Sequence, residues 1–128
     1  MSNQTAYEDI EAMLDEILDE LPEDICRGLN GGVILVPSVK MHPERKADDL
    51  YILGEYHVKY PGLGRYVTIY FGSFVSLYDN AGAERQRNEL RKILYHELLH
   101  HMESLAGERD LEIKDAEDLE KYRRKFRL

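Results

Sequence analysis

Cysteine is almost absent from this chain: Cys26 is the single one among 128 residues. No disulfide can therefore form within the chain, and we expect a protein of the reducing cytoplasm with Cys26 packed among apolar side chains. Long hydrophobic runs are also absent, and the polar, acidic residues 1–24 differ from a targeting peptide. These absences argue against a membrane protein. A chain of 128 residues supports one core, so we expect a single domain over residues 1–128.

Basic residues are missing from the first part of the chain, where nine acidic and no basic residues lie between Glu8 and Asp24. The formal net charge of −8 argues against nucleic acid or an anionic membrane as the main partner. Residues 121–128 are the exception, with five basic side chains. A basic tail can contact nucleic acid, but we favour pairing of these side chains with a helix dipole and with the acidic first segment. We therefore expect no nucleic-acid partner and no membrane partner.

Residues 5–20 show apolar side chains at helical spacing. Thr5 and Glu8 have the spacing of a capping box, and Pro22 marks the end of the helix. The short β-branched run Val33–Val36 then predicts a buried strand.

A β-hairpin is predicted in the middle of the chain. Residues 50–60 and 65–78 are rich in Tyr, Ile, Val and Phe, and the Pro-Gly-Leu-Gly sequence between them favours a turn. We expect the second strand to be Tyr66–Phe71. His57 falls in the first strand, where an ordinary hydrogen bond is a better interpretation than metal binding.

A long helix is predicted over about residues 83–105, capped by Asp79–Gly82 and ending near Gly107. Its apolar stripe contains Leu90, Leu94, Leu98 and Leu105. A last helix is expected to begin at Asp115. The order of helix, strands, helix and helix indicates an α+β domain.

The second long helix carries an HExxH motif, formed by His96, Glu97 and His100. Residues four apart lie on one helix face, so both imidazoles can bind one metal ion. Zinc lowers the pKa of a bound water to about 7, and Glu97 is placed to accept its proton. Because the leucine stripe lies opposite the two histidines, the sequence predicts a zinc site rather than a solvated helix face.

A catalytic zinc usually has three protein ligands, and the HExxH motif does not identify the third one. Glu103 shares the face of His96 and His100, but it lies about 10.5 Å along the helix axis from His96. A hydrogen bond or a surface ion pair is an equally good interpretation of Glu103. His101 points about 100° away from His100, so we expect it to pack or orient rather than to bind metal.

Beyond HExxHH, the sequence continues to Gly107 and Asp110. This arrangement resembles the small bacterial zincin-like metallopeptidase family, one-domain proteins of unassigned substrate whose typical motif is HExxHHxGxxD. Four additional residues precede GxxD here. The resemblance implies a minimal zincin-like fold, zinc as cofactor and Asp110 as the third ligand, with Glu103 as the alternative. It also extends to the acidic first helix and to the two strands of the hairpin.

The motif and the resemblance together predict a cytoplasmic zinc-dependent peptidase that acts on a peptide or protein. Glu97 is the expected general base, and an exposed hairpin strand could hold an extended substrate. The alternative is a non-catalytic zincin-like scaffold that binds a protein partner and contains a structural metal. An intact Glu97 argues against this alternative, because a structural site needs no base.

Overall fold

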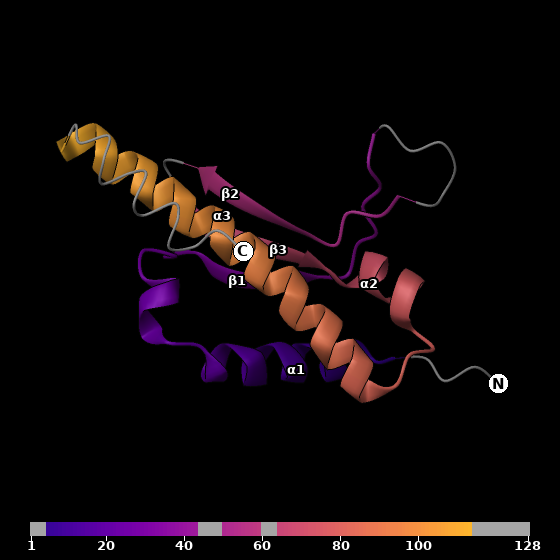
Figure 1. Ribbon diagram of the computed structural model, residues 1–128. Coiled ribbons are helices and arrows are strands. Elements are labelled where there is room, and N and C mark those ends of the chain that lie inside the picture. The colour runs from indigo at the N-terminus through magenta and orange to yellow at the C-terminus, as the bar shows by residue number, and fades with distance from the viewer. Residues whose placement is uncertain (1–4, 44–49, 60–63, 114–128) are drawn as a thin grey trace.

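The computed structural model describes residues 5–43, 50–59 and 64–113, the last six of them by their backbone alone. These residues form an α+β fold, as predicted (Figure 1). In chain order the elements are α1 (Tyr7–Glu20), the 3-10 helix η1 (Glu23–Cys26), β1 (Gly32–Val36), β2 (Gly54–Lys59), β3 (Gly64–Tyr70), α2 (Phe71–Tyr78) and α3 (Ala83–Ile113).

The three strands form one mixed sheet in the order β1-β3-β2. β2 and β3 are antiparallel, with Glu55 opposite Thr68, which confirms the predicted hairpin. β1 is parallel to β3, with Ile34 opposite Thr68. β3 is therefore central, and β2 is an edge strand of the sheet within the described part of the chain. Every residue of β1 is partly exposed, so this strand is less buried than predicted.

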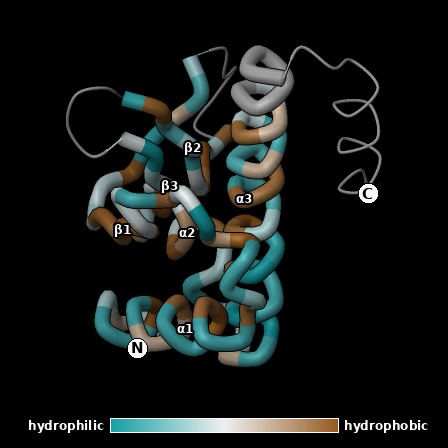
Figure 2. The backbone as a smooth tube through the Cα atoms, turned by 90° about the vertical axis from the view of Figure 1, so that its left-hand side faces the viewer, coloured by the Kyte–Doolittle hydropathy of each residue, from teal (hydrophilic) through white to brown (hydrophobic). Residues whose placement is uncertain are grey.

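The core lies where α1 and α3 meet the sheet, and the hydrophobic side of each helix faces it (Figure 2). The helical spacing of apolar residues in both segments accounts for this, because it gives each helix one continuous apolar side. The fully buried side chains that join the two helices and β3 include Ile10, Ile17, Val67, Ile69, Leu90 and Leu94. No helix in the described ranges combines the length and apolarity needed to cross a membrane.

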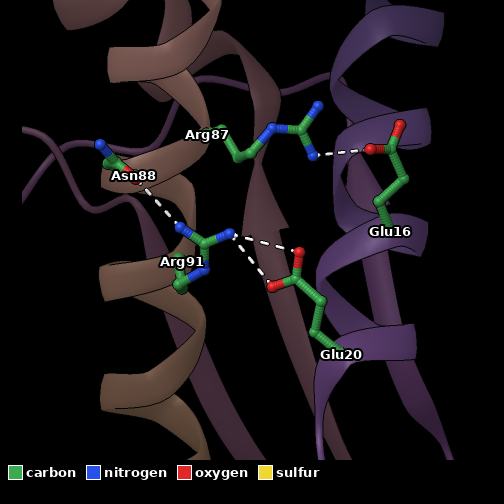
Figure 3. A network of polar contacts seen from close by, with 5 residues as sticks. All are labelled: Glu16, Glu20, Arg87, Asn88 and Arg91. Carbon is green, nitrogen blue, oxygen red and sulfur yellow. Dashed lines mark hydrogen bonds and ion pairs between the residues drawn. The ribbon is translucent and has the colours of Figure 1, made fainter.

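Acidic side chains of α1 pair with arginines of α3 (Figure 3). Arg87 Nη1 lies 2.8 Å from Glu16 Oε2, and Arg91 Nη2 lies 3.1 Å from Glu20 Oε2. These pairs are partly exposed, so each contributes at most about 1 kcal/mol. The C-terminal basic residues that were expected to pair with α1 lie outside the described residues.

The capping box predicted for α1 is absent. The N-cap of α1 is Ala6, without a side-chain hydrogen bond. Thr5 instead donates its N–H to the carboxylate of Asp79, and its hydroxyl accepts a hydrogen bond from Gln86. Asp79 ends α2 and does not cap α3. Tertiary partners therefore replace the local capping bonds that the sequence pattern favours.

Two boundaries also differ from the prediction. Phe71, expected at the end of a strand, begins α2, where the N–H of Gly72 bonds to the carbonyl of Ser38. α3 passes through Gly107 and continues to Ile113, because a single glycine costs a helix only about 1 kcal/mol and does not have to end it. The helix expected from Asp115 lies outside the described residues.

Candidate metal centre

His96 and His100 lie on the exposed side of α3, one helical turn apart, as the HExxH spacing predicts. Their Nε2 atoms are 3.1 Å apart, and the two rings are nearly perpendicular. Two nitrogens bound to one tetrahedral zinc at about 2.0–2.1 Å lie about 3.3–3.4 Å from each other. The imidazole pair therefore fits one edge of a zinc coordination tetrahedron with little adjustment.

Glu97 is between the two histidines in sequence but is buried, with 7% of its surface exposed. Burial raises the pKa of the Glu97 carboxyl, while the neighbouring His96 and His100 act in the opposite direction. A carboxyl whose pKa is raised by desolvation is suited to accept and return a proton near neutral pH.

Gly54 allows α3 to approach β2 closely at this point. A Cβ atom built on Gly54 would lie 3.0 Å from Ile93 Cγ2 and 3.4 Å from Glu97 Cγ. A larger side chain would require Ile93 and its neighbours to shift by a few tenths of an ångström. Nothing in the sequence motif marks this glycine, because the contact joins residues about 40 positions apart.

A shallow, open cleft runs between the HExxH face of α3 and β2. One side comes from β2 and the segment before it, and the other side comes from α3. The lining residues are Ile52, Gly54, Glu55, Tyr56, Val58, His96, Glu97, His100, Glu103 and Ser104. The sequence predicted the site residues His96, Glu97, His100 and Glu103 of α3, whereas β2 was predicted only as a hairpin strand that shares the family resemblance and could hold a substrate.

Glu55 joins Lys40 and Tyr70 in a polar cluster at this strand. Lys40 Nζ lies 2.6 Å from Glu55 Oε1, and the Tyr70 hydroxyl donates to the same oxygen. Burial raises the pKa of Glu55, but these two hydrogen bonds outweigh it and leave the pKa below its ordinary value. Glu55 is thus ionised and already paired, which distinguishes it from Glu97.

His101 is fully buried and packs, as predicted. Its Nδ1 lies 2.8 Å from the Tyr56 hydroxyl, and its Nε2 lies 2.7 Å from the carbonyl oxygen of Arg27. Burial lowers the pKa of His101 and keeps the ring neutral near pH 7. Gly28, at φ +82°, makes the turn after this carbonyl, and its position would place a Cβ 3.8 Å from the His101 ring.

In the described part of the chain, the structure does not place a third ligand beside His96 and His100, although the sequence predicted one. Glu103 is exposed and lines the cleft. The backbone of Asp110 belongs to α3, about 15 Å beyond His100 along the axis, and its side chain lies outside the described residues. The expected turn at Gly107 that would bring Asp110 back is absent. Among the described residues, no three His, Cys, Asp or Glu side chains form a metal-binding group.

Two other sequence candidates lie away from the cleft. His57 stacks on Tyr66 with ring centroids 4.5 Å apart, and burial lowers its pKa. Cys26 is a half-buried free thiol that packs against the core, and burial raises its pKa. Neither side chain lines the cleft.

No protein-family model matches the chain, and no curated protein matches it. Among solved structures, it is similar to a conserved hypothetical protein from Thermus thermophilus, with 33% sequence identity and a TM-score of 0.68. The match covers 80% of this chain and 99% of that one, so it includes nearly the whole of the other protein. Identity at this level over nearly a complete chain shows common descent. The chain therefore belongs to the same family as this conserved hypothetical protein.

Proposed function

We propose that the protein is a zinc-dependent peptidase of the minimal zincin-like type. The observation that carries the proposal is the exposed His96–His100 pair, with Nε2 atoms 3.1 Å apart, beside the buried carboxyl of Glu97. Two imidazoles at zinc spacing next to a desolvated base supply two of the three usual protein ligands and the general base of metal-assisted peptide hydrolysis. A structural metal would have no use for the base.

The residues of this chain divide the chemistry between them. Zinc, when bound, would acidify a water molecule and polarise the peptide carbonyl. His96 and His100 would hold the ion. Glu97 accepts a proton from the attacking water and then donates it to the leaving amine. Its burial supports this double role, because the raised pKa of its carboxyl lies closer to neutral pH.

The third zinc ligand is proposed to be a carboxylate of α3. Glu103 has the better support, since it follows His100 by three residues and lines the same cleft. Asp110, the ligand that the zincin-like resemblance implies, requires α3 to break between Gly107 and Asp110. The two assignments make opposite predictions for the zinc affinity of Glu103→Ala and Asp110→Ala.

The substrate is proposed to be an extended segment of a peptide or protein. Within the described residues β2 has one neighbouring strand, β3, and its other side borders the cleft. An extended chain can pair with such an edge through main-chain hydrogen bonds. The opposite edge is less suitable, because the Leu35 carbonyl of β1 already accepts a bond from the Tyr7 hydroxyl.

The test combines metal analysis with a proteome-wide cleavage screen. The parent should contain about one zinc per chain and cleave a defined set of peptides. Glu97→Gln should retain the zinc and lose about 100-fold or more of the cleavage rate, because an amide cannot act as the base. Glu84→Gln, on the exposed start of the same helix, is the matched control and should behave as the parent.

Two outcomes contradict this proposal in different ways. Absence of zinc from the parent would remove the metal centre. A zinc-bound parent whose cleavage pattern is the same as that of Glu97→Gln would exclude peptidase activity and favour the non-catalytic protein-binding scaffold.

A further inference from the structure

A chain of hydrogen bonds connects β3, β2, α3 and the segment after η1. Arg65 Nη1 lies 2.9 Å from the Tyr56 hydroxyl and also bonds to Ser104. The Tyr56 hydroxyl lies 2.8 Å from His101 Nδ1, and His101 Nε2 lies 2.7 Å from the carbonyl oxygen of Arg27. His101 is fully buried and Arg65 is 6% exposed, while Tyr56 and Ser104 are partly buried and line the cleft.

The chemistry of the groups fixes the direction of each bond. The carbonyl of Arg27 can only accept, so His101 Nε2 carries the hydrogen and donates it. The neutral ring then accepts at Nδ1, and the Tyr56 hydroxyl is the donor to it. A guanidinium can only donate, so Arg65 donates to the Tyr56 oxygen. The Tyr56 hydroxyl therefore donates once and accepts once, with a partner from a different element on each side.

This chain of bonds determines how α3 is rotated against β2. Successive residues of a helix point about 100° apart, so the direction of His101 sets the direction of His100. Tyr56 holds His101 from β2, the strand that borders the cleft. Two residues earlier in the same strand, a Cβ atom on Gly54 would lie 3.4 Å from Glu97 Cγ, so α3 is close to β2 at this point as well. A small rotation of α3 would move His100 and Glu97 together relative to this strand.

We propose that Tyr56 is a positioning residue of the metal centre, which acts through His101 to fix the orientation of His100 and Glu97. The inference rests on the proposed zinc site and adds a residue that is not part of the HExxH motif. Loss of the Tyr56 hydroxyl leaves His101 Nδ1 without its donor and weakens the restraint on the rotation of α3. Zinc binding must then also fix the rotation of α3. Because this ordering costs free energy, the zinc affinity falls.

The experiment compares Tyr56→Phe with Tyr7→Phe. Each substitution removes one phenolic hydroxyl whose hydrogen bond crosses between elements, since Tyr7 bonds to the carbonyl of Leu35 in β1. Both variants should fold, and both should have a lower melting temperature than the parent. Zinc affinity is measured by competition with a chromophoric chelator. Bound cobalt is used as a second probe, because its visible absorption reports the geometry of the ligands.

Tyr56→Phe should bind zinc about tenfold more weakly than the parent. This is the lower end of the range measured when a residue that orients a metal ligand is replaced. Tyr7→Phe should change the zinc affinity by less than about twofold. The cobalt spectrum should shift in Tyr56→Phe alone. A general loss of stability would move the two variants equally, so equal affinities and identical cobalt spectra would overturn the inference.

His96→Ala separates failure of this inference from failure of the proposed function. If His96→Ala abolishes zinc binding while Tyr56→Phe matches Tyr7→Phe, the metal centre stands and the role of Tyr56 is overturned. If the parent itself binds no zinc, both are overturned.

Discussion

His100 and His101 are neighbours in the chain and have opposite environments. His100 is exposed, and its Nε2 lies 3.1 Å from that of His96. His101 is fully buried, and both of its ring nitrogens have partners from other elements. The two faces of α3 that they represent differ in the same way: one presents imidazoles to a cleft, and the other packs leucines against the core.

The comparison shows how a buried structural histidine differs from one that remains accessible to a ligand. A buried imidazole needs a donor and an acceptor to compensate for lost water, and the fold supplies both to His101. An exposed imidazole has no such need. The i,i+4 spacing brings His96 and His100 together on the exposed face, and their Nε2 atoms, 3.1 Å apart, remain accessible to a ligand from the cleft.

The largest effect is expected on the exposed face. His96→Ala and His100→Ala should each weaken zinc binding by more than about 100-fold, because loss of a direct ligand costs more than loss of its hydrogen-bond partner. His57→Ala is the control and should bind zinc as the parent does, since His57 stacks on Tyr66 outside the cleft. Zinc titration of the three variants is the measurement. Full zinc retention in both α3 variants would refute the site.

The buried face should affect stability instead. Leu98 is 2% exposed, and Leu98→Ala should lower the free energy of unfolding by about 2–5 kcal/mol through lost burial and a cavity. Tyr95 is 42% exposed on the other side of the same helix, and Tyr95→Ala should cost less than about 0.5 kcal/mol. Denaturant unfolding measures both. Similar costs for the two would mean that α3 is not rotated as described.

The third ligand should give a smaller effect on zinc affinity. Glu103→Ala should weaken binding by less than loss of either histidine, because Glu103 is exposed and water can occupy the vacated ligand position, whereas Asp110→Ala should have little effect if α3 stays helical beyond Gly107. A loss confined to Asp110→Ala would restore the assignment that the zincin-like resemblance implies. If neither substitution matters, Asp115 and Asp118 are the next positions to replace.

The smallest effect concerns the path of α3 itself. Gly107 lies within the helix, and a Cβ there would meet no atom within 4 Å. Gly107→Ala should therefore raise the free energy of unfolding by about 0.5–1 kcal/mol. A glycine that ended the helix in a left-handed conformation would give the opposite sign. Thermal or denaturant unfolding decides between these two paths.

Local patterns in the sequence predicted the elements of the fold well where one face of each is apolar. The spacing of Ile10 and Ile17 predicted α1 and its buried side, and the spacing of Leu90 and Leu94 did the same for α3. The Pro-Gly-Leu-Gly turn signal predicted the hairpin. The pattern failed at Phe71 and Gly107, where apolar content and a single glycine were interpreted as a strand end and a helix end. At Phe71 the structure depends on a contact with a distant segment, the hydrogen bond from Gly72 to Ser38. At Gly107 the helix simply continues through the glycine. Local propensity predicts neither outcome.

The sequence alone determined the spacing of His96, Glu97 and His100, because helical periodicity places residues four apart on one face whatever surrounds them. Only the tertiary structure decided the rest of the site. Gly54 and Tyr56 reach α3 from a strand about 40 residues earlier in the chain, and no local pattern encodes contacts over that separation. The burial of Glu97 and the hydrogen-bond chain through His101 likewise exist only because β2 packs against α3.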